Sequence, residues 1–108
     1  MKFCVIHNLR FETPAKQDTF HNDILVRIGG KKIWGETITV KGTDTEGYPF
    51  HNLTIRFENK ADMDELFALI KDKVAQIPVL KGTVSKHKCS HDEGTVQPCK
   101  ITEEYSKG

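Results

Sequence analysis

The stretch Leu53–Pro78, LTIRFENKADMDELFALIKDKVAQIP, holds the strongest local signals of secondary structure in the chain. Its opening run, LTIRFE, alternates between apolar and polar residues, which is the pattern of a half-exposed β-strand. From about residue 60 to residue 76, apolar residues then recur at spacings of three and four, which predicts an amphipathic helix. A strand followed by a helix with one apolar stripe indicates a helix that packs on a sheet.

The expected helix has signals at both ends. Asn59 is a good N-cap residue, and Asp62 stands three residues later, in the first turn. Lys71 and Lys73 lie near the carboxyl end, where the helix dipole favours positive charge. Pro78 cannot continue a helix and is expected to end it.

Alternation predicts further strands on the amino-terminal side. A strand is expected from Lys2 to about Glu12, with His7 on its apolar face as a core histidine. Residues 13–18 are interpreted as a loop. Ile24, Val26 and Ile28 alternate and predict a second strand, after which Gly29-Gly30 forms a hairpin turn. The return strand requires a β-bulge at Gly35, and Gly42–Pro49 is expected as a loop.

The remainder is expected to be extended as far as Cys89, to turn at Asp92–Gly94 and to return from Val96 to Ile101. The tail Glu103–Gly108 is expected to fray. These elements predict an α+β fold: an antiparallel sheet with one amphipathic helix on a face and a C-terminal hairpin or knuckle. The length of 108 residues fits a single domain, 1–108.

Composition excludes several classes of protein. The 16 Lys and Arg residues against 15 Asp and Glu residues give no electrostatic argument for nucleic acid or a membrane as partner. The chain has no apolar run of the roughly 18 residues that a membrane span needs. Its three cysteines are too few for a disulfide scaffold. We therefore expect a cytoplasmic protein with reduced thiols.

One cluster carries chemical content. His87, Cys89, His91 and Cys99 follow the pattern H-x-C-x-H-x7-C, and thiolates with imidazoles are ligands that suit tetrahedral zinc. A chain reversal about Gly94 places Cys89 opposite Cys99, and a reversal centred on the preceding residue places His87 opposite Cys99. Either register keeps all four side chains on one face.

The strand geometry also sets a limit on this cluster. A flat strand separates residues 87 and 91 by about 13 Å, so one ion reaches all the ligands only if the backbone bends. Three interpretations therefore stay open: a structural zinc site, a disulfide between Cys89 and Cys99, and an ordinary hairpin with free thiols. Cys4 is expected in the core, away from this cluster.

The function predicted from these observations is that of a small non-enzymatic binding or regulatory protein. Its partner is expected to be a protein or a second copy of the chain. The expected contact surfaces are the sheet edges and the loop Gly42–Pro49. One alternative is a small metal-dependent hydrolase with Glu93 as its base. Another is a weak nucleic-acid binder whose cations would be the lysine pairs Lys31, Lys32, Lys86 and Lys88.

Overall fold

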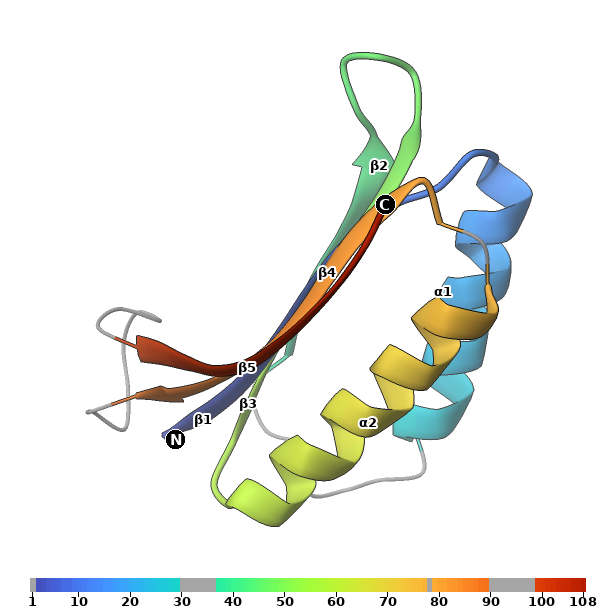
Figure 1. Cartoon of the computed structure of the whole chain (residues 1–108). Helices are drawn as coiled ribbons and strands as arrows, with labels where there is room; N and C mark the ends of the chain where they lie inside the picture. The colour runs from blue at the N-terminus through green and yellow to red at the C-terminus, as the bar shows by residue number, and fades with distance from the viewer. Residues whose placement is uncertain (1, 30–36, 78, 90–98) are drawn as a thin grey trace.

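Two helices and five strands make up the secondary structure of the residues that the computed structural model describes, which are 2–29, 37–77, 79–89 and 99–108 (Figure 1). In chain order the elements are β1 (Phe3–Arg10), α1 (Pro14–Gly29), β2 (Thr37–Thr43), β3 (Pro49–Phe57), α2 (Lys60–Gln76), β4 (Lys81–Cys89) and β5 (Cys99–Lys107). The predicted α+β class, with an antiparallel sheet and a helix packed on it, is confirmed.

The sheet order is β2-β3-β1-β4-β5, and every neighbouring pair is antiparallel. The first four strands and the two helices follow the order β-α-β-β-α-β. Strand β3 lies between β1 and β2, and β1 lies between β3 and β4, so each β-α-β unit is split by a strand of the other. This is the ferredoxin-like arrangement, here extended by β5 at one edge. Such an arrangement is compatible with many functions and specifies none.

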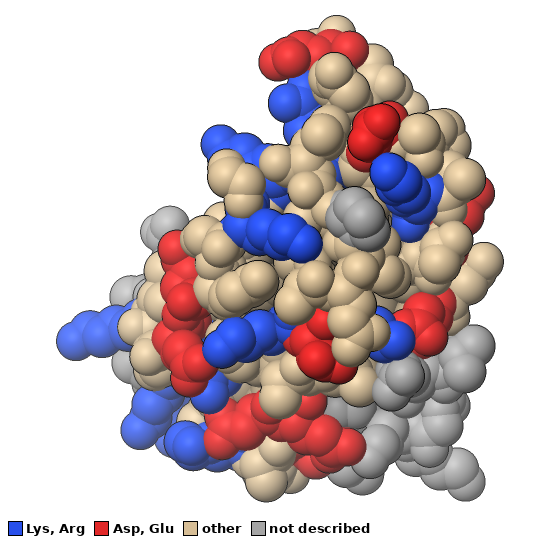
Figure 2. Space-filling model, turned by 45° about the vertical axis from the view of Figure 1, so that its right-hand side comes forward, with Lys and Arg blue, Asp and Glu red and all other residues tan. Residues whose placement is uncertain are grey.

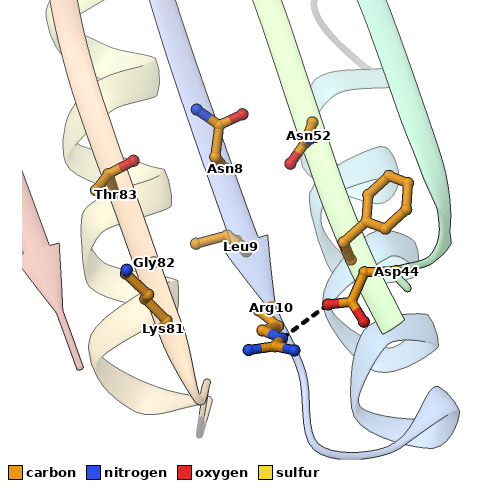
Figure 3. Close-up of a pocket in the computed structure, with 9 residues that line it drawn as sticks. Asn8, Leu9, Arg10, Asp44, Asn52, Lys81, Gly82 and Thr83 are labelled. Atoms are coloured by element: carbon orange, nitrogen blue, oxygen red, sulfur yellow. Dashed lines mark ion pairs between the residues drawn. The ribbon is translucent and has the colours of Figure 1, made fainter. Parts of the chain in front are cut away.

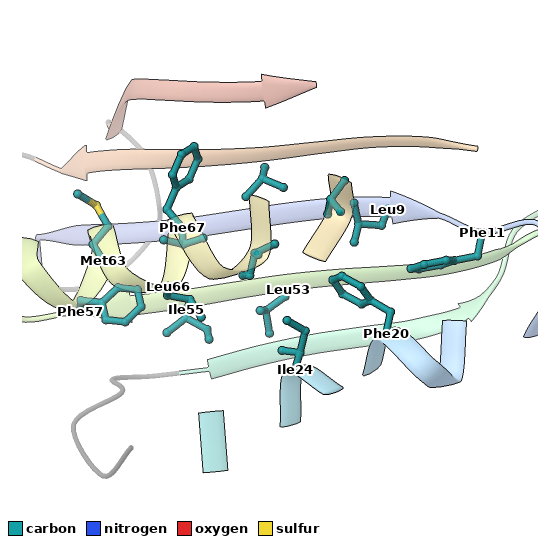
Figure 4. Packing of buried hydrophobic residues seen from close by; sticks show 14 residues of the cluster. Leu9, Phe11, Phe20, Ile24, Leu53, Ile55, Phe57, Met63, Leu66 and Phe67 are labelled. Carbon is teal, nitrogen blue, oxygen red and sulfur yellow. The ribbon is translucent and has the colours of Figure 1, made fainter. Parts of the chain in front are cut away.

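Both described helices lie on the same side of the sheet and leave its opposite side uncovered (Figure 1). The core fills the space between the sheet and the helices, where aromatic and aliphatic side chains interdigitate (Figure 4). On β1 the buried positions alternate as the sequence predicts, with Val5, His7 and Leu9 facing the helices. The sheet therefore has one apolar face, which the helices cover, and a second face that they leave uncovered, which we call the open face.

Helix α2 forms where the sequence predicts it. The Asn59 side chain accepts a hydrogen bond from the Asp62 backbone N–H at 2.9 Å, and its amide donates to the Asp62 carboxylate at 2.9 Å. The buried stripe faces the sheet and consists of Asp62, Met63, Leu66, Phe67, Ile70 and Val74. No helix among the described residues is both long and apolar enough to cross a membrane.

The strand predicted over Ile24–Ile28 is wrong, because these residues belong to α1. Thr13 caps this helix through its hydroxyl, which accepts from the Lys16 N–H at 3.3 Å, and Pro14 takes the first helical position. Phe20 and Ile24 then pack into the core at helical spacing. Because the chain remains helical through residue 29, the glycine hairpin is not formed there. The segment that would hold the bulge at Gly35 lies outside the described residues.

The carboxyl terminus also differs from the prediction. Instead of fraying after Glu103, the chain continues as β5 to Lys107. Tyr105 packs against the core, and the Lys107 ammonium donates to the Val74 carbonyl at the end of α2 at 3.1 Å. These contacts, together with pairing to β4, hold the last strand on the sheet.

Candidate functional site

The β4–β5 hairpin brings part of the predicted metal cluster together. In its backbone register Cys89 faces Cys99, and His87 faces Ile101. This is the first of the two registers that the sequence allows. His91 and Glu93 lie outside the described residues. Among the residues that are described, no three side chains of His, Cys, Asp or Glu gather as metal ligands would.

His87 lies on the open face, in the same row of the sheet as Cys4. The two residues face each other across the β1–β4 pair, and a bulge follows Lys86 in the β4–β5 pair. The His87 Nε2 atom and the Ser85 hydroxyl oxygen are 2.8 Å apart. Burial lowers the pKa of His87, while Glu104 acts to raise it. Cys4 is fully buried, as predicted, and it lies on the face opposite His7.

A shallow hollow of about 240 Å³ lies on the open face, toward the carboxyl end of β1. Asn8 is at its centre, and the sheet register places Asn52 of β3 on one side of it and Thr83 of β4 on the other. These three side chains project from neighbouring strands toward the same side (Figure 3). Arg10 and Lys81 line the hollow one row further along, together with Asp44 and Phe50.

Arg10 holds the loop between β2 and β3 next to this hollow. The Arg10 guanidinium pairs with Asp44 at 2.8 Å (Figure 3) and with Glu46 at 3.1 Å. The central carbon of the guanidinium also lies 4.4 Å from the centre of the Tyr48 ring. The loop predicted as a contact surface is therefore held next to the hollow, and Arg10 already has carboxylate partners.

The other polar groups of the hollow have unused hydrogen-bonding capacity. Within the described part of the chain, the side chains of Asn8, Asn52 and Thr83 make no hydrogen bond, and no carboxylate pairs with Lys81. An Asn carboxamide can donate and accept at once, a hydroxyl can do both, and a lysine ammonium offers three donors. The hollow therefore offers two carboxamides, a hydroxyl and a cation to an external group.

A second polar cluster lies on the helix side, inside the core. His7 of β1 and His51 of β3 are 0% and 1% exposed, and the His7 Nε2 and His51 Nδ1 atoms are 2.8 Å apart. The other ring nitrogen of His51 lies 2.7 Å from Nδ1 of His21, a half-buried residue of α1. We call His7, His51 and His21 the histidine chain. Phe20 packs edge-on against the rings of His7 and His51.

Burial keeps the histidine chain uncharged. It lowers the pKa of His51 to about 4, with His21 and Lys41 acting in the same direction. Burial, and after it the neighbouring His51, holds the pKa of His7 well below its ordinary value. The pKa of His21 is lowered by burial and by Lys41, while Asp18 acts to raise it. At neutral pH the histidine chain therefore consists of three neutral imidazoles joined by two hydrogen bonds.

Sequence reasoning places His7 correctly in the core but misses its two partners. His51 precedes Leu53, Ile55 and Phe57 at the same parity, so extending that alternation backward by one step would have predicted its burial. His21 follows Phe20 and lies half-buried beside the buried positions of α1, which the strand prediction obscured. The sequence therefore contains a burial signal at both positions, but it is recognised only when β3 and α1 are assigned correctly.

The cations proposed for nucleic acid are not all available. Lys86 points to the helix side, where its side chain is only 14% exposed and pairs with Asp64 at 2.9 Å and Glu103 at 3.2 Å. Lys31 and Lys32 lie outside the described residues. On the face that Figure 2 shows, basic and acidic side chains are interspersed.

The chain matches no known protein-family model, and no curated protein resembles it closely enough to count as a relative. Its function must therefore be argued from the chemistry of its own residues.

Proposed function

We propose that the protein is a non-enzymatic binding or regulatory module that receives a peptide segment of a protein partner in the hollow of its open face. The observation that carries this proposal is the unpaired polar row Asn52–Asn8–Thr83, set across three strands beside the cation Lys81. These groups lie on the side of the sheet that the helices leave uncovered (Figure 1).

The chemistry of the row indicates what kind of segment it fits. A carboxamide matches a peptide group, because both carry an N–H donor and a carbonyl acceptor. Lys81 adds a positive charge that favours a carboxylate, and the ring of Phe50 adds apolar surface at the side of the hollow. The expected ligand is an extended segment with one carboxylate, supplied either by an acidic side chain or by a chain terminus.

Titration of the ¹⁵N-labelled protein with three short peptides tests the proposal. The first is acetylated and amidated with one central Asp, the second has Asn in its place, and the third combines Asn with a free carboxyl terminus. We expect shifts at Asn8, Asn52 and Thr83 with the first or the third peptide and weaker shifts with the second. The first and third peptides separate a side-chain carboxylate from a terminal one.

Two variants and a matched control sharpen this experiment. Lys81→Ala should weaken binding about threefold, as expected for an exposed charge pair, and Asn8→Ala about threefold to tenfold. Lys60→Ala removes a cation from the exposed surface of α2 and should leave the affinity unchanged. Shifts centred on α2, or equal affinity of all three peptides for the wild-type and Lys81→Ala proteins, would sink the proposal.

A structural zinc ion on the β4–β5 hairpin is the second part of the proposal, with His87, Cys89, His91 and Cys99 as its ligands. It is supported by the backbone register, in which Cys89 faces Cys99 with His87 two residues away. Zinc bound by these residues would fasten the two strands together at the end of the hairpin.

Metal analysis of the purified protein tests this second part. We expect about one zinc ion per chain, lost in Cys99→Ser and retained in Cys4→Ser, because Cys4 belongs to β1 and is not one of the four proposed ligands. Less than about a tenth of an equivalent would rule out the zinc site. A count of three free thiols in the metal-free protein would rule out the Cys89–Cys99 disulfide, since the chain has three cysteines.

A further inference from the structure

The histidine chain connects one helix to the sheet through the core. His21 belongs to α1, while His51 and His7 belong to neighbouring strands, and both bonds of the chain are 2.7–2.8 Å long. We propose that the histidine chain is a pH-dependent contact, which holds α1 on the sheet at neutral pH and releases it in mild acid. This inference is independent of the hollow on the open face.

The arrangement of protons follows from an unpaired atom at the buried end. Among the described residues, His7 Nδ1 has no hydrogen-bond partner. A buried N–H without an acceptor is rarer and more costly than a bare acceptor. The favoured arrangement therefore leaves His7 Nδ1 bare, so that His7 Nε2–H donates to His51 Nδ1. His51 Nε2–H then donates to His21 Nδ1, and the remaining proton of His21 is on its own Nε2.

In this arrangement a proton that arrives at His21 from solvent finds no vacant nitrogen. Its Nε2 already carries a proton, and its Nδ1 accepts the bond from His51. Protonation of Nδ1 would set two N–H groups against each other across 2.7 Å. The alternative is that His51 and His7 both change to the Nδ1–H tautomer, which leaves a buried N–H without an acceptor on His7 and a cation on the half-buried His21. Acid therefore weakens the contact between α1 and β3 by either route.

Other groups around the histidine chain modulate this effect without replacing it. Lys41 of β2 faces His21 and His51 and opposes their protonation, while Asp18 of α1 favours protonation of His21 and pairs with Lys41 at 2.8 Å. Asp23, two residues beyond His21, pairs with Lys73 of α2 at 2.8 Å. No charged group of the described residues faces His7, and the titratable group beside it is the His51 imidazole.

Protonation of the histidine chain is expected to loosen α1 before α2. Two hydrogen bonds from the Gln17 amide, to the carbonyls of Gly42 and Phe50, also hold α1, and these do not depend on pH in this range. Helix α2 takes no part in the histidine chain. Its buried stripe and its cap contain no imidazole, so protonation of the chain removes no bond that α2 makes.

Hydrogen exchange measured residue by residue tests the inference. If His7 and His51 are neutral with α1 docked and titrate at the ordinary value of 6.5 once it is released, protection factors in α1 should fall about a hundredfold between about pH 7.5 and pH 5.5. Those in α2 should remain much higher than those in α1. Imidazole ¹⁵N shifts at neutral pH should show the Nε2–H tautomer for all three histidines.

Two variants complete the test. His51→Gln keeps a donor and an acceptor between His7 and His21 but does not titrate, so it should reduce the fall in α1 protection from about a hundredfold to about tenfold. Asn22→Gln is the matched control, since it changes the exposed, non-titrating neighbour of His21 on α1 and should leave that dependence intact. The inference is overturned if α1 and α2 lose protection together, if α1 keeps its protection at pH 5.5, or if His21 carries its proton on Nδ1 at neutral pH.

Discussion

His51 illustrates how a single residue can connect three elements of this molecule. It lies on the buried face of β3, and both of its ring nitrogens are occupied, one by His7 and one by His21. A neutral imidazole has one donor and one acceptor, so this position uses its full hydrogen-bonding capacity. A buried polar group that is fully paired costs little, whereas the same group in its charged form is expensive.

The first residue-scale prediction concerns acid. The pKa of His51 is about 4 in the folded protein, below its ordinary value of 6.5, so the unfolded chain binds more protons in acid. The contribution of His51 to stability is therefore fully present above about pH 6.5 and is lost as the pH falls toward 4. The loss amounts to about 3 kcal/mol in the free energy of unfolding. Urea denaturation at a series of pH values measures it, and a free energy that is flat between about pH 7 and pH 5 would contradict it.

The second residue-scale prediction concerns Cys4. Burial raises the pKa of its thiol to about 11, although Arg56 acts to lower it. At about pH 8 the thiol should therefore be protonated as well as buried, and it should react with iodoacetamide only when the protein unfolds. Mass spectrometry of the native and the urea-treated protein locates the label. Labelling of native Cys4 at the rate of an unfolded thiol would show that it is not buried.

At the scale of elements, α2 and α1 differ in how visibly their sequences encode them. Helix α2 has an apolar residue at nearly every buried position of its stripe, and its cap is formed by Asn59 and Asp62 as predicted. Over its first eleven residues, Pro14–Ile24, helix α1 buries only Gln17, Phe20 and Ile24 among its side chains. Gln17 is polar and is buried because its amide reaches two carbonyls of the sheet.

Removal of the α2 cap should lower stability by a measurable amount. In Asn59→Ala the Asp62 N–H loses its acceptor and the Asp62 carboxylate loses a donor. We expect a loss of about 1 kcal/mol in the free energy of unfolding, measured by urea denaturation. Lys60→Ala, one residue along the chain and exposed, should change it by less than about 0.5 kcal/mol. Equal effects of the two substitutions would show that Asn59 does not act as a cap.

The sequence predicts the parts of this fold whose signals are local. It predicts α2 and the faces of β1, and it allows the register in which Cys89 faces Cys99 as one of two. It fails at α1 because Ile24, Val26 and Ile28 alternate like a strand, and this pattern outweighed the signal of Thr13-Pro14, a cap followed by proline at the first helical position.

The candidate sites depend on relations that no local pattern contains. Asn8 and Asn52 become neighbours only when β1 pairs with β3, and the histidine chain forms only when α1 packs over that pair. Neither strand neighbourhood nor helix placement follows from periodicity within a segment. Side chains that meet in this way are therefore found from the structure.

At the scale of the whole molecule, the two faces of the sheet contribute unequally to stability. Ile55 is fully buried beneath the helices, while its neighbour Thr54 lies half-buried on the open face. Ile55→Ala should lower the free energy of unfolding by about 2–5 kcal/mol, because it leaves a cavity in the centre of the core. Thr54→Ala, on the same strand, should cost less than about 1 kcal/mol. Thermal unfolding followed by circular dichroism compares the two, and a larger loss for Thr54→Ala would mean that the faces are assigned in reverse.

The central position of β1 has a consequence for the synthesis of the protein. Of the five described strands, β1 is synthesised first, yet it lies in the middle of the sheet, where Phe3 pairs with Phe57 on one side and with Lys88 on the other. While the chain is being translated, this apolar strand has neither neighbour until residues 49–57 and then 81–89 emerge. The native sheet therefore closes only after residues 81–89 have been synthesised, and until then β1 lacks the neighbours that complete its pairing.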